Sequence, residues 1–219
     1  MRFDAIPLDV LERCRDALSR PDRAAGDAEF EALAEQLLPD LRALLFGLLR
    51  DHDETDDVLV ECLVRIHRHL PSLLDLGKFP AWIIRMAVNQ VHGARAKSSA
   101  RPMTTLDADD APEPEPRTRV GHAATPPSPR AAAEGRQMRA TLDAALGTLP
   151  PRQRDSVTLY EIEGMSVREV ALTLECSEGA VKFHLHEGRK KLRNALGATI
   201  AGTTTAAAPA HAREMVHGA

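Results

Sequence analysis

The side chains best suited to chemistry gather on one predicted helix near the C-terminus. The stretch 177–193 reads SEGAVKFHLHEGRKKLR. Polar residues in the first turns of a helix that enters a DNA major groove can reach base edges, and basic residues beside them can neutralise phosphates. The candidates for base contacts are Ser177, Glu178, Gly179, Lys182, Phe183 and His186, and the candidates for phosphate contacts are Arg189, Lys190, Lys191 and Arg193.

The residues before this stretch predict the elements that would position it. Pro150 and Pro151 favour the start of a helix that ends at Gly164. Ser166, with Glu169 three residues later, is a capping box that opens a second, short helix. A tight turn then leads to Ser177, so the segment predicts a helix-turn-helix. Helical hairpins with a basic end often bind nothing, and this spacing alone leaves DNA binding open. The residues expected to face inward on the first helix are Val157, Tyr160 and Ile162.

The N-terminal half of the chain is also predicted to be helical. Apolar residues recur at helical spacing in four stretches, and no alternating run is long enough for a strand. Pro39 is expected to break or kink the second stretch. The fold class is therefore all-α.

Composition divides the chain of 219 residues into two small helical domains joined by a flexible linker. Seven of its 15 prolines lie between residues 98 and 135, among Ala, Thr and acidic residues. The predicted organisation is an N-terminal extension with a helix (1–26), a helical bundle (27–97), the linker (98–135), the helix-turn-helix domain (136–196) and a disordered tail (197–219).

Charge and composition limit the function classes. The net charge is −4, and residues 1–84 hold 17 acidic against 10 basic side chains, whereas residues 85–97 hold three basic side chains and no acidic one. This separation suits one protein partner and one nucleic-acid partner. The three cysteines form no CxxC pair, and the closely spaced His pairs point apart on a helix, so we expect no metal site. The sequence has no catalytic triad and no phosphate-binding loop, so we expect neither enzymatic activity nor a bound cofactor. No stretch suits membrane insertion, so a cytoplasmic protein is expected.

Three motifs resemble a known family. The stretch LPPRQRDSVTLYEIEGMSVREVALTLECSEGAVKFHLHEGRKKLR is similar to region 4 of the extracytoplasmic-function (ECF, group IV) sigma factors of the sigma-70 family. DDVLVECLVRIHRHL resembles region 2.2 of the same family, and FPAWIIRMAVNQV resembles the stretch that follows it. Their order, on either side of a linker, makes the resemblance more specific than any one motif.

The resemblance implies a dissociable subunit that binds core RNA polymerase and directs transcription initiation. Region 4 would read the −35 element through the helix that begins after Ser177. Region 2 would melt the −10 element, holding a flipped base in the loop from Leu70 to Lys78. The residues implied to bind core polymerase are Asp57, Val58, Glu61 and Arg65. Those implied to bind −10 DNA are Trp82, Arg85, Asn89, Arg95 and Lys97, followed by Arg101. Trp82 also lies at core-packing spacing with Phe79 and Met86.

The chain departs from the family pattern at several of these positions. Val60 stands where Gln is frequent, Gly93 near a frequent Asp, and Glu175 where the turn often has Gly. His184 and Glu187 replace two customary arginines, and Gly188 replaces Ala. We therefore expect either an unusual −35 preference or weak DNA binding by region 4 alone, and a turn at Glu175 that is strained or differently shaped.

The resemblance also implies a partner, an anti-sigma factor that covers both domains. Two other functions are compatible with the residues. One is a helix-turn-helix regulator that acts without polymerase, and the other is a degenerate sigma-like decoy that binds an anti-sigma factor but not DNA.

Overall fold

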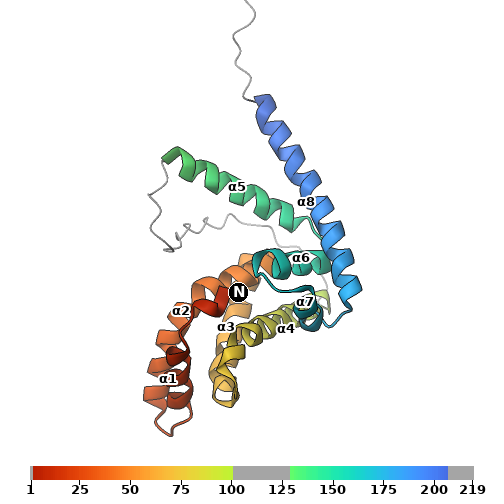
Figure 1. The fold of residues 1–219 in the computed structure, drawn as a ribbon. Coiled ribbons are helices and arrows are strands. Elements are labelled where there is room, and N and C mark those ends of the chain that lie inside the picture. The colour runs from red at the N-terminus through yellow and green to blue at the C-terminus, as the bar shows by residue number, and fades with distance from the viewer. Residues whose placement is uncertain (1, 101–128, 207–219) are drawn as a thin grey trace, which may run out of the picture.

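The computed structural model describes residues 2–100 and 129–206, and these ranges are helical with no strand (Figure 1). The N-terminal helices are η1 (Arg2–Ala5), α1 (Leu8–Leu18), α2 (Arg23–Leu49), α3 (His52–His69), the short turns η2 (Leu70–Ser72) and η3 (Leu76–Lys78), and α4 (Phe79–Ala100). The C-terminal helices are α5 (Pro129–Gly147), α6 (Pro151–Val157), the π-helical η4 (Thr158–Ile162), α7 (Val167–Thr173) and α8 (Glu178–Ala206). No described helix is long and apolar enough to cross a membrane.

Helices α2, α3 and α4 form the N-terminal bundle around a leucine-rich core. Leu41, Leu44 and Leu48 of α2 are fully buried, with Ile66 of α3 and Ile83 of α4. Acidic N-caps fix where α2 and α3 begin, because a side-chain oxygen satisfies a backbone N–H that the helix leaves free. Asp51, for example, accepts a hydrogen bond from the backbone N–H of Glu54 at 2.8 Å.

The N-terminal extension is part of this bundle. Phe3 is 1% exposed and Leu11 2% exposed, and both belong to the same buried cluster as α2. A Cβ on Gly26 would lie 3.2 Å from the carbonyl oxygen of Ala17, so α1 and α2 approach closely there. Because α2 begins at Arg23, the predicted boundary between residues 26 and 27 falls inside a helix.

Proline 39 does not break α2, which runs continuously from Arg23 to Leu49. Of the two expected outcomes, a break or a kink, the break is therefore wrong. Leu37 and Leu41 on either side of it are fully buried. Packing of this face against the bundle outweighs the lost backbone hydrogen bond.

Two predicted boundaries also differ from the structure. Helix α5 begins at Pro129, inside the expected linker, because Pro129 is the last proline of that stretch and suits the first position of a helix. Helix α8 continues to Ala206, ten residues into the expected tail. Adding residues to a helix that packing has already nucleated costs less than starting a new one. The rest of the linker and tail, residues 101–128 and 207–219, lies outside the described residues.

The C-terminal helices pack around α8 and also contact the bundle. Val157, Val170 and Val181 form their buried centre, with Leu159 and Leu185. In Figure 1, α6 and α7 lie between the bundle and α8, while the C-terminal half of α8 extends away from both. Helices α6 and η4 contact α2 directly. One apolar cluster therefore continues from the bundle into the C-terminal helices.

Candidate nucleic-acid interface

A stripe of exposed residues follows one face of α8. Gly179, Lys182, Phe183, His186 and Lys190 recur every three or four residues and are all exposed, whereas Val181 and Leu185 on the other side are buried. Phe183 keeps 60% of its surface exposed, which is unusual for a large apolar ring. We name these five exposed residues the reading stripe. It combines a cation, a hydrogen-bonding imidazole and an apolar ring, three groups that can contact base edges in a major groove.

Local capping sets the start of α8. The Ser177 hydroxyl accepts a hydrogen bond from the backbone N–H of Ala180 at 3.1 Å, and the predicted capping box of Ser166 and Glu169 is present at the start of α7. Hydrogen bonds from Ser166 hold the pKa of Glu169 below its ordinary value. These contacts confirm the helix-turn-helix that the sequence predicted.

The turn between α7 and α8 is strained as expected. Glu175 has φ +52°, in the left-handed region that favours glycine. Its neighbour Cys176 donates its backbone N–H to the carbonyl of Ala171 at 3.0 Å. The turn keeps the shape that a glycine would provide, but the backbone of Glu175 must adopt a conformation that is disfavoured for a residue with a side chain.

The basic end of the reading stripe borders a hollow of about 660 Å³ between η4 and α8, lined by Tyr160, Val167, Lys182, Leu185, His186, Arg189, Lys190 and Arg193. Arg189 donates from Nε to the Glu161 carboxylate at 2.6 Å and lies 5.4 Å from the centre of the Tyr160 ring. The hydrogen bond to Glu161 raises the pKa of Arg189. Arg189 is thus held by η4, whereas Lys182 and Lys190 project at the rim of the hollow.

The remaining sequence-predicted residues of this region are divided between surface and interior. Ser177 and Glu178 are exposed at the start of α8. Glu187 is half-buried, and His184 is turned inward, with a buried Nδ1 that has no hydrogen-bond partner among the described residues. Of the two histidines at this helix, His186 alone belongs to the reading stripe. Ile162, expected to face inward, is 44% exposed because the chain leaves regular α-helix at η4.

A second row of polar residues lies on α4. Arg85 and Asn89 are exposed one turn apart, and Trp82 is half-buried with its ring centre 5.8 Å from that of Phe79. Trp82 therefore packs against the core while keeping part of its ring accessible. The adjoining loop from Leu70 to Lys78 is built from η2 and η3, and its Leu74 is 97% exposed.

Arg95 and Lys97 do not continue this row. Six residues after Asn89, Arg95 lies about 120° around the helix axis and pairs with Asp155 of α6 at 2.7 Å. Lys97 is exposed, with Nζ 3.7 Å from the Glu61 carboxylate of α3. Arg101 lies outside the described residues.

Helix α3 separates its predicted polymerase-binding residues. Asp57, Glu61 and Arg65 are exposed, but Val58 is 3% exposed and packs in the core. Val58 was therefore wrongly placed on the contact surface. It belongs to the same apolar stripe as Cys62 and Ile66, and that period buries it.

Two apolar residues of α3 were missed as contact candidates. Val60 is 61% exposed and Val64 50% exposed, on the same face as Asp57 and Glu61. With Phe30, Leu63, His67 and Arg68 they line an apolar groove of about 390 Å³. The signal was present in the sequence, because both valines fall off the buried stripe of an otherwise amphipathic helix.

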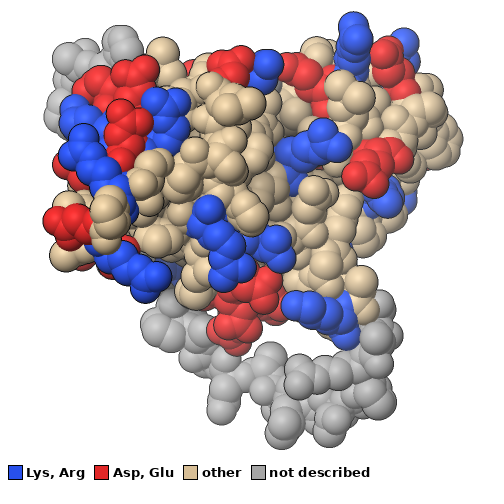
Figure 2. All heavy atoms as spheres, turned by 90° about the horizontal axis from the view of Figure 1, so that it is seen from below, with Lys and Arg blue, Asp and Glu red and all other residues tan. Residues whose placement is uncertain are grey.

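Acidic and basic side chains are interspersed on the face seen in Figure 2, around a broad uncharged surface. The charge separation counted along the chain thus does not become a single-sign patch on that face. Among the residues that the structure describes, no three His, Cys, Asp or Glu side chains are placed to hold a metal ion.

Models of known protein families match both folded parts of the chain. The family "Sigma-70 region 2" matches residues 33–101, and the family "Sigma-70, region 4" matches residues 139–192. The chain belongs to the sigma-70 family and is an ECF-type RNA polymerase sigma factor. A sigma factor binds core polymerase and promoter DNA, directs promoter recognition and is not an enzyme. The sequence-based assignment of family, fold class and function is confirmed.

The curated relatives of this chain are also sigma factors. This sigma factor is 28% identical over 193 residues to the ECF sigma factor SigE of Mycolicibacterium smegmatis, covering 83% of this chain and 71% of that protein. It is 25% identical over 182 residues to the sigma-H factor of Pseudomonas aeruginosa, covering 83% and 91%. It is 26% identical over 142 residues to the ECF sigma-E factor of Escherichia coli K12, covering 64% and 73%.

Two solved structures share the fold. The sigma factor RpoE, in complex with the anti-sigma factor NepR from Bartonella quintana, matches with a TM-score of 0.56 and 18% identity, covering 77% of this chain and 97% of that one. CnrH, in complex with the cytosolic domain of CnrY, matches with a TM-score of 0.51 and 22% identity, covering 86% and 97%.

Proposed function

We propose that the reading stripe of α8 is the surface by which this sigma factor reads the −35 element. The observation that carries this proposal is the exposure of Lys182, Phe183 and His186 on one face, directly after a capped turn. An Arg or Lys donates to guanine, and an apolar ring contacts the thymine methyl group. The stripe therefore favours an element in which guanine lies next to thymine. Arg189 and Lys190 supply phosphate contacts that set the register. Ser177 and Glu178 at the helix start are proposed to face base edges, where a carboxylate can accept a hydrogen bond from cytosine N4.

The α4 row and the adjoining loop are proposed to hold the −10 strand. Trp82 is half-buried, and Arg85 and Asn89 are exposed beside it on the same helix. One partly exposed ring with a cation and an amide suits a single unstacked base and its phosphate. Arg95 and Lys97 would extend this contact along the strand once Arg95 leaves Asp155.

The exposed face of α3 is proposed to dock on core polymerase. Its apolar groove is flanked by Asp57, Glu61 and Arg65, so an apolar contact would be surrounded by charged residues. That arrangement is typical of protein interfaces, whose centre is drier than the rim.

Three further properties are proposed for the whole sigma factor. Its two folded units correspond to region 2, including α1, and to region 4, from α5 to α8. It acts in the cytoplasm, where the polymerase works. An anti-sigma factor is its proposed regulator, since both structural relatives were solved with such a partner or with a second protein's cytosolic domain.

Replacing Lys182 by alanine should change −35 preference. Loss of a base contact is expected to cost about 1–3 kcal/mol at one base pair and to leave other positions unchanged. The measurement is run-off transcription with core polymerase from promoters carrying each base substitution in the −35 element.

Lys191→Ala is the matched control, because Lys191 is exposed on α8 but lies off the reading stripe. It should weaken binding uniformly or not at all. Equal loss at every −35 position in Lys182→Ala would reduce Lys182 to a phosphate contact. Duplex binding without transcripts would instead indicate a regulator that acts without polymerase.

A further inference from the structure

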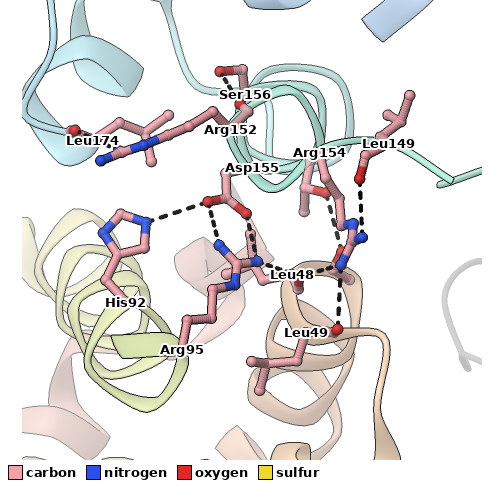
Figure 3. A network of polar contacts seen from close by, with 12 residues as sticks. Leu48, Leu49, His92, Arg95, Leu149, Arg152, Arg154, Asp155, Ser156 and Leu174 are labelled. Carbon is pink, nitrogen blue, oxygen red and sulfur yellow. Dashed lines mark hydrogen bonds and ion pairs between the residues drawn. The ribbon is translucent and has the colours of Figure 1, made fainter. Parts of the chain in front are cut away.

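Beside the apolar cluster that joins the two regions, their contact contains a group of charged side chains. The Arg95 guanidinium of α4 donates to both carboxylate oxygens of Asp155 on α6, at 2.7 and 3.0 Å, and to the carbonyl of Leu48 at 2.6 Å (Figure 3). His92 lies 3.3 Å from the same carboxylate. The Asp155 side chain is only 1% exposed. A carboxylate of region 4 is thus buried by side chains of region 2.

A second arginine, Arg154, donates to the same carbonyl of Leu48 as Arg95. Arg154 of α6 donates to the carbonyls of Leu48 and Leu49 at the end of α2, at 3.2 and 3.3 Å. It also donates to the carbonyls of Leu146 and Gly147 at the end of α5 and to that of Leu149, two residues after the helix ends. The last carbonyls of a helix lack intrahelical partners and carry partial negative charge, so cations collect there. Arg154 thereby joins the C-terminal ends of two helices, one from each region.

Two further contacts surround this cluster. Arg50 pairs with Asp143 of α5 at 3.0 Å, and Thr158 of η4 packs on Gly47, to whose ideal Cβ its Cγ2 would lie 3.3 Å away. We name the set of Arg95, Asp155, Arg154 and the carbonyls of Leu48 and Leu49 the clasp. Burial alone would raise the pKa of Asp155, but hydrogen bonds from His92 and Arg95 hold it below its ordinary value. The carboxylate is therefore charged at neutral pH.

The clasp uses a residue that the promoter needs. Arg95 was implied by sequence to contact a phosphate beside the melted strand, yet in this structure its terminal nitrogens donate to Asp155 and Leu48. A guanidinium binds a phosphate and a carboxylate with the same two-pronged geometry. A DNA phosphate and Asp155 therefore compete for one side chain.

A buried ion pair suits a reversible contact. Its desolvation cost offsets much of its attraction, so it adds specificity to the closed arrangement without making opening prohibitive. On opening, Asp155 and Arg95 both return to water. A ligand that binds only the open form then shifts the balance by its differential affinity.

We propose that the clasp is an autoinhibitory contact that holds region 4 on region 2 and withholds Arg95 from the −10 strand until polymerase and promoter DNA open it. This inference rests on the proposed −10 role of Arg95. Closure and −10 binding exclude each other, and by linkage each weakens the other by the same factor.

Asp155→Asn tests the clasp in the free, full-length protein. The variant removes the charge that Arg95 neutralises in the closed form and costs nothing in the open form. Its radius of gyration by small-angle X-ray scattering should rise, and its affinity for single-stranded −10 DNA should rise by about threefold or more as the competent fraction grows. Asp56→Asn is the control, because it breaks the exposed pair with Arg42 inside region 2. An unchanged radius and DNA affinity in Asp155→Asn would overturn the proposal.

A reversible crosslink tests it independently of any effect of Asp155 on folding. The crosslink is a disulfide between Gly47→Cys and Thr158→Cys. An ideal Cβ at position 47 lies 3.3 Å from Cγ2 and 4.0 Å from Oγ1 of Thr158, the two positions that a cysteine Sγ at 158 could occupy. Cys176→Ser removes the half-exposed native thiol, while burial raises the pKa of Cys14 to about 11 and that of Cys62 to about 12 and keeps both unreactive.

Run-off transcription by the oxidised protein should be at least about tenfold lower than by the reduced protein, and reduction should restore it. Each single cysteine variant should be insensitive to oxidant. Equal transcription by the crosslinked and reduced proteins would overturn the clasp. Failure of the reduced protein to transcribe would count against the proposed promoter contacts, whereas the scattering result for Asp155→Asn decides the clasp without reference to transcription.

Discussion

Replacing Val60 and Val64 together by aspartate should reduce the affinity of this sigma factor for core polymerase by at least about 100-fold. Val60 is 61% exposed and Val64 50% exposed on α3, so the free protein loses little packing. In a docked complex the two carboxylates would be buried in an apolar groove without partners. Each would cost about 2 kcal/mol or more, and two such losses exceed a factor of 100. Competition binding against a labelled wild-type sigma factor measures the change.

Two controls separate this effect from a general loss of solubility or fold. Leu8→Asp introduces the same charge at an apolar residue of α1 that is 55% exposed, and it should leave polymerase affinity within about twofold. Binding of region 4 to a −35 duplex should be unchanged in the double variant, because α3 lies outside the reading stripe. Wild-type affinity in the double variant would show that polymerase docks elsewhere.

Much of this fold could be predicted because local signals agree with tertiary packing. The capping box at Ser166, the cap at Ser177 and the stop at Gly164 are local features, and each lies where the sequence places it. The reading stripe follows from helical periodicity alone once the start of α8 is known. These features need no knowledge of distant residues.

The errors arise where distant packing decides. Pro39 predicts a break from local chemistry, but burial of the flanking leucines in the bundle keeps α2 continuous. Val58 follows the family's motif, yet its place on the apolar stripe of α3 buries it.

The clasp was not predictable in the same way. Arg95 and Asp155 are 60 residues apart and stand in different motifs, and either one alone has the pattern of a solvated charge. Arg154 has five carbonyl partners from two helix ends, and a carbonyl leaves no signature in a sequence. The resemblance to the family pattern implied that Arg95 contacts DNA. That contact belongs to the open form of the proposal, whereas the structure shows the closed form.

A methyl group added at Gly188 should destabilise region 4 by about 1–2 kcal/mol, the second large effect expected. An ideal Cβ at this position lies 2.8 Å from Cγ2 of Val157, closer than real Cβ contacts allow. Val157 is 3% exposed and β-branched, so it has neither room nor a second favourable rotamer to relieve the clash. Overpacking of this kind costs about 1–3 kcal/mol, against which the better helix propensity of alanine returns up to about 1 kcal/mol. Faster amide hydrogen exchange in α6 and α8 measures the loss.

Gly93→Ala provides the matched comparison with the opposite sign. Gly93 is exposed in α4, and nothing lies within 4 Å of its ideal Cβ, so alanine gains helix propensity without a clash. It should stabilise region 2 by about 0.5–1 kcal/mol. Trp82 is the only tryptophan and lies in region 2, so its fluorescence reports that unfolding separately from exchange in region 4.

Equal exchange protection of α6 and α8 in Gly188→Ala and wild type would mean that α8 shifts outward at no cost. The close packing of α8 on α6 would then not be what positions the reading stripe.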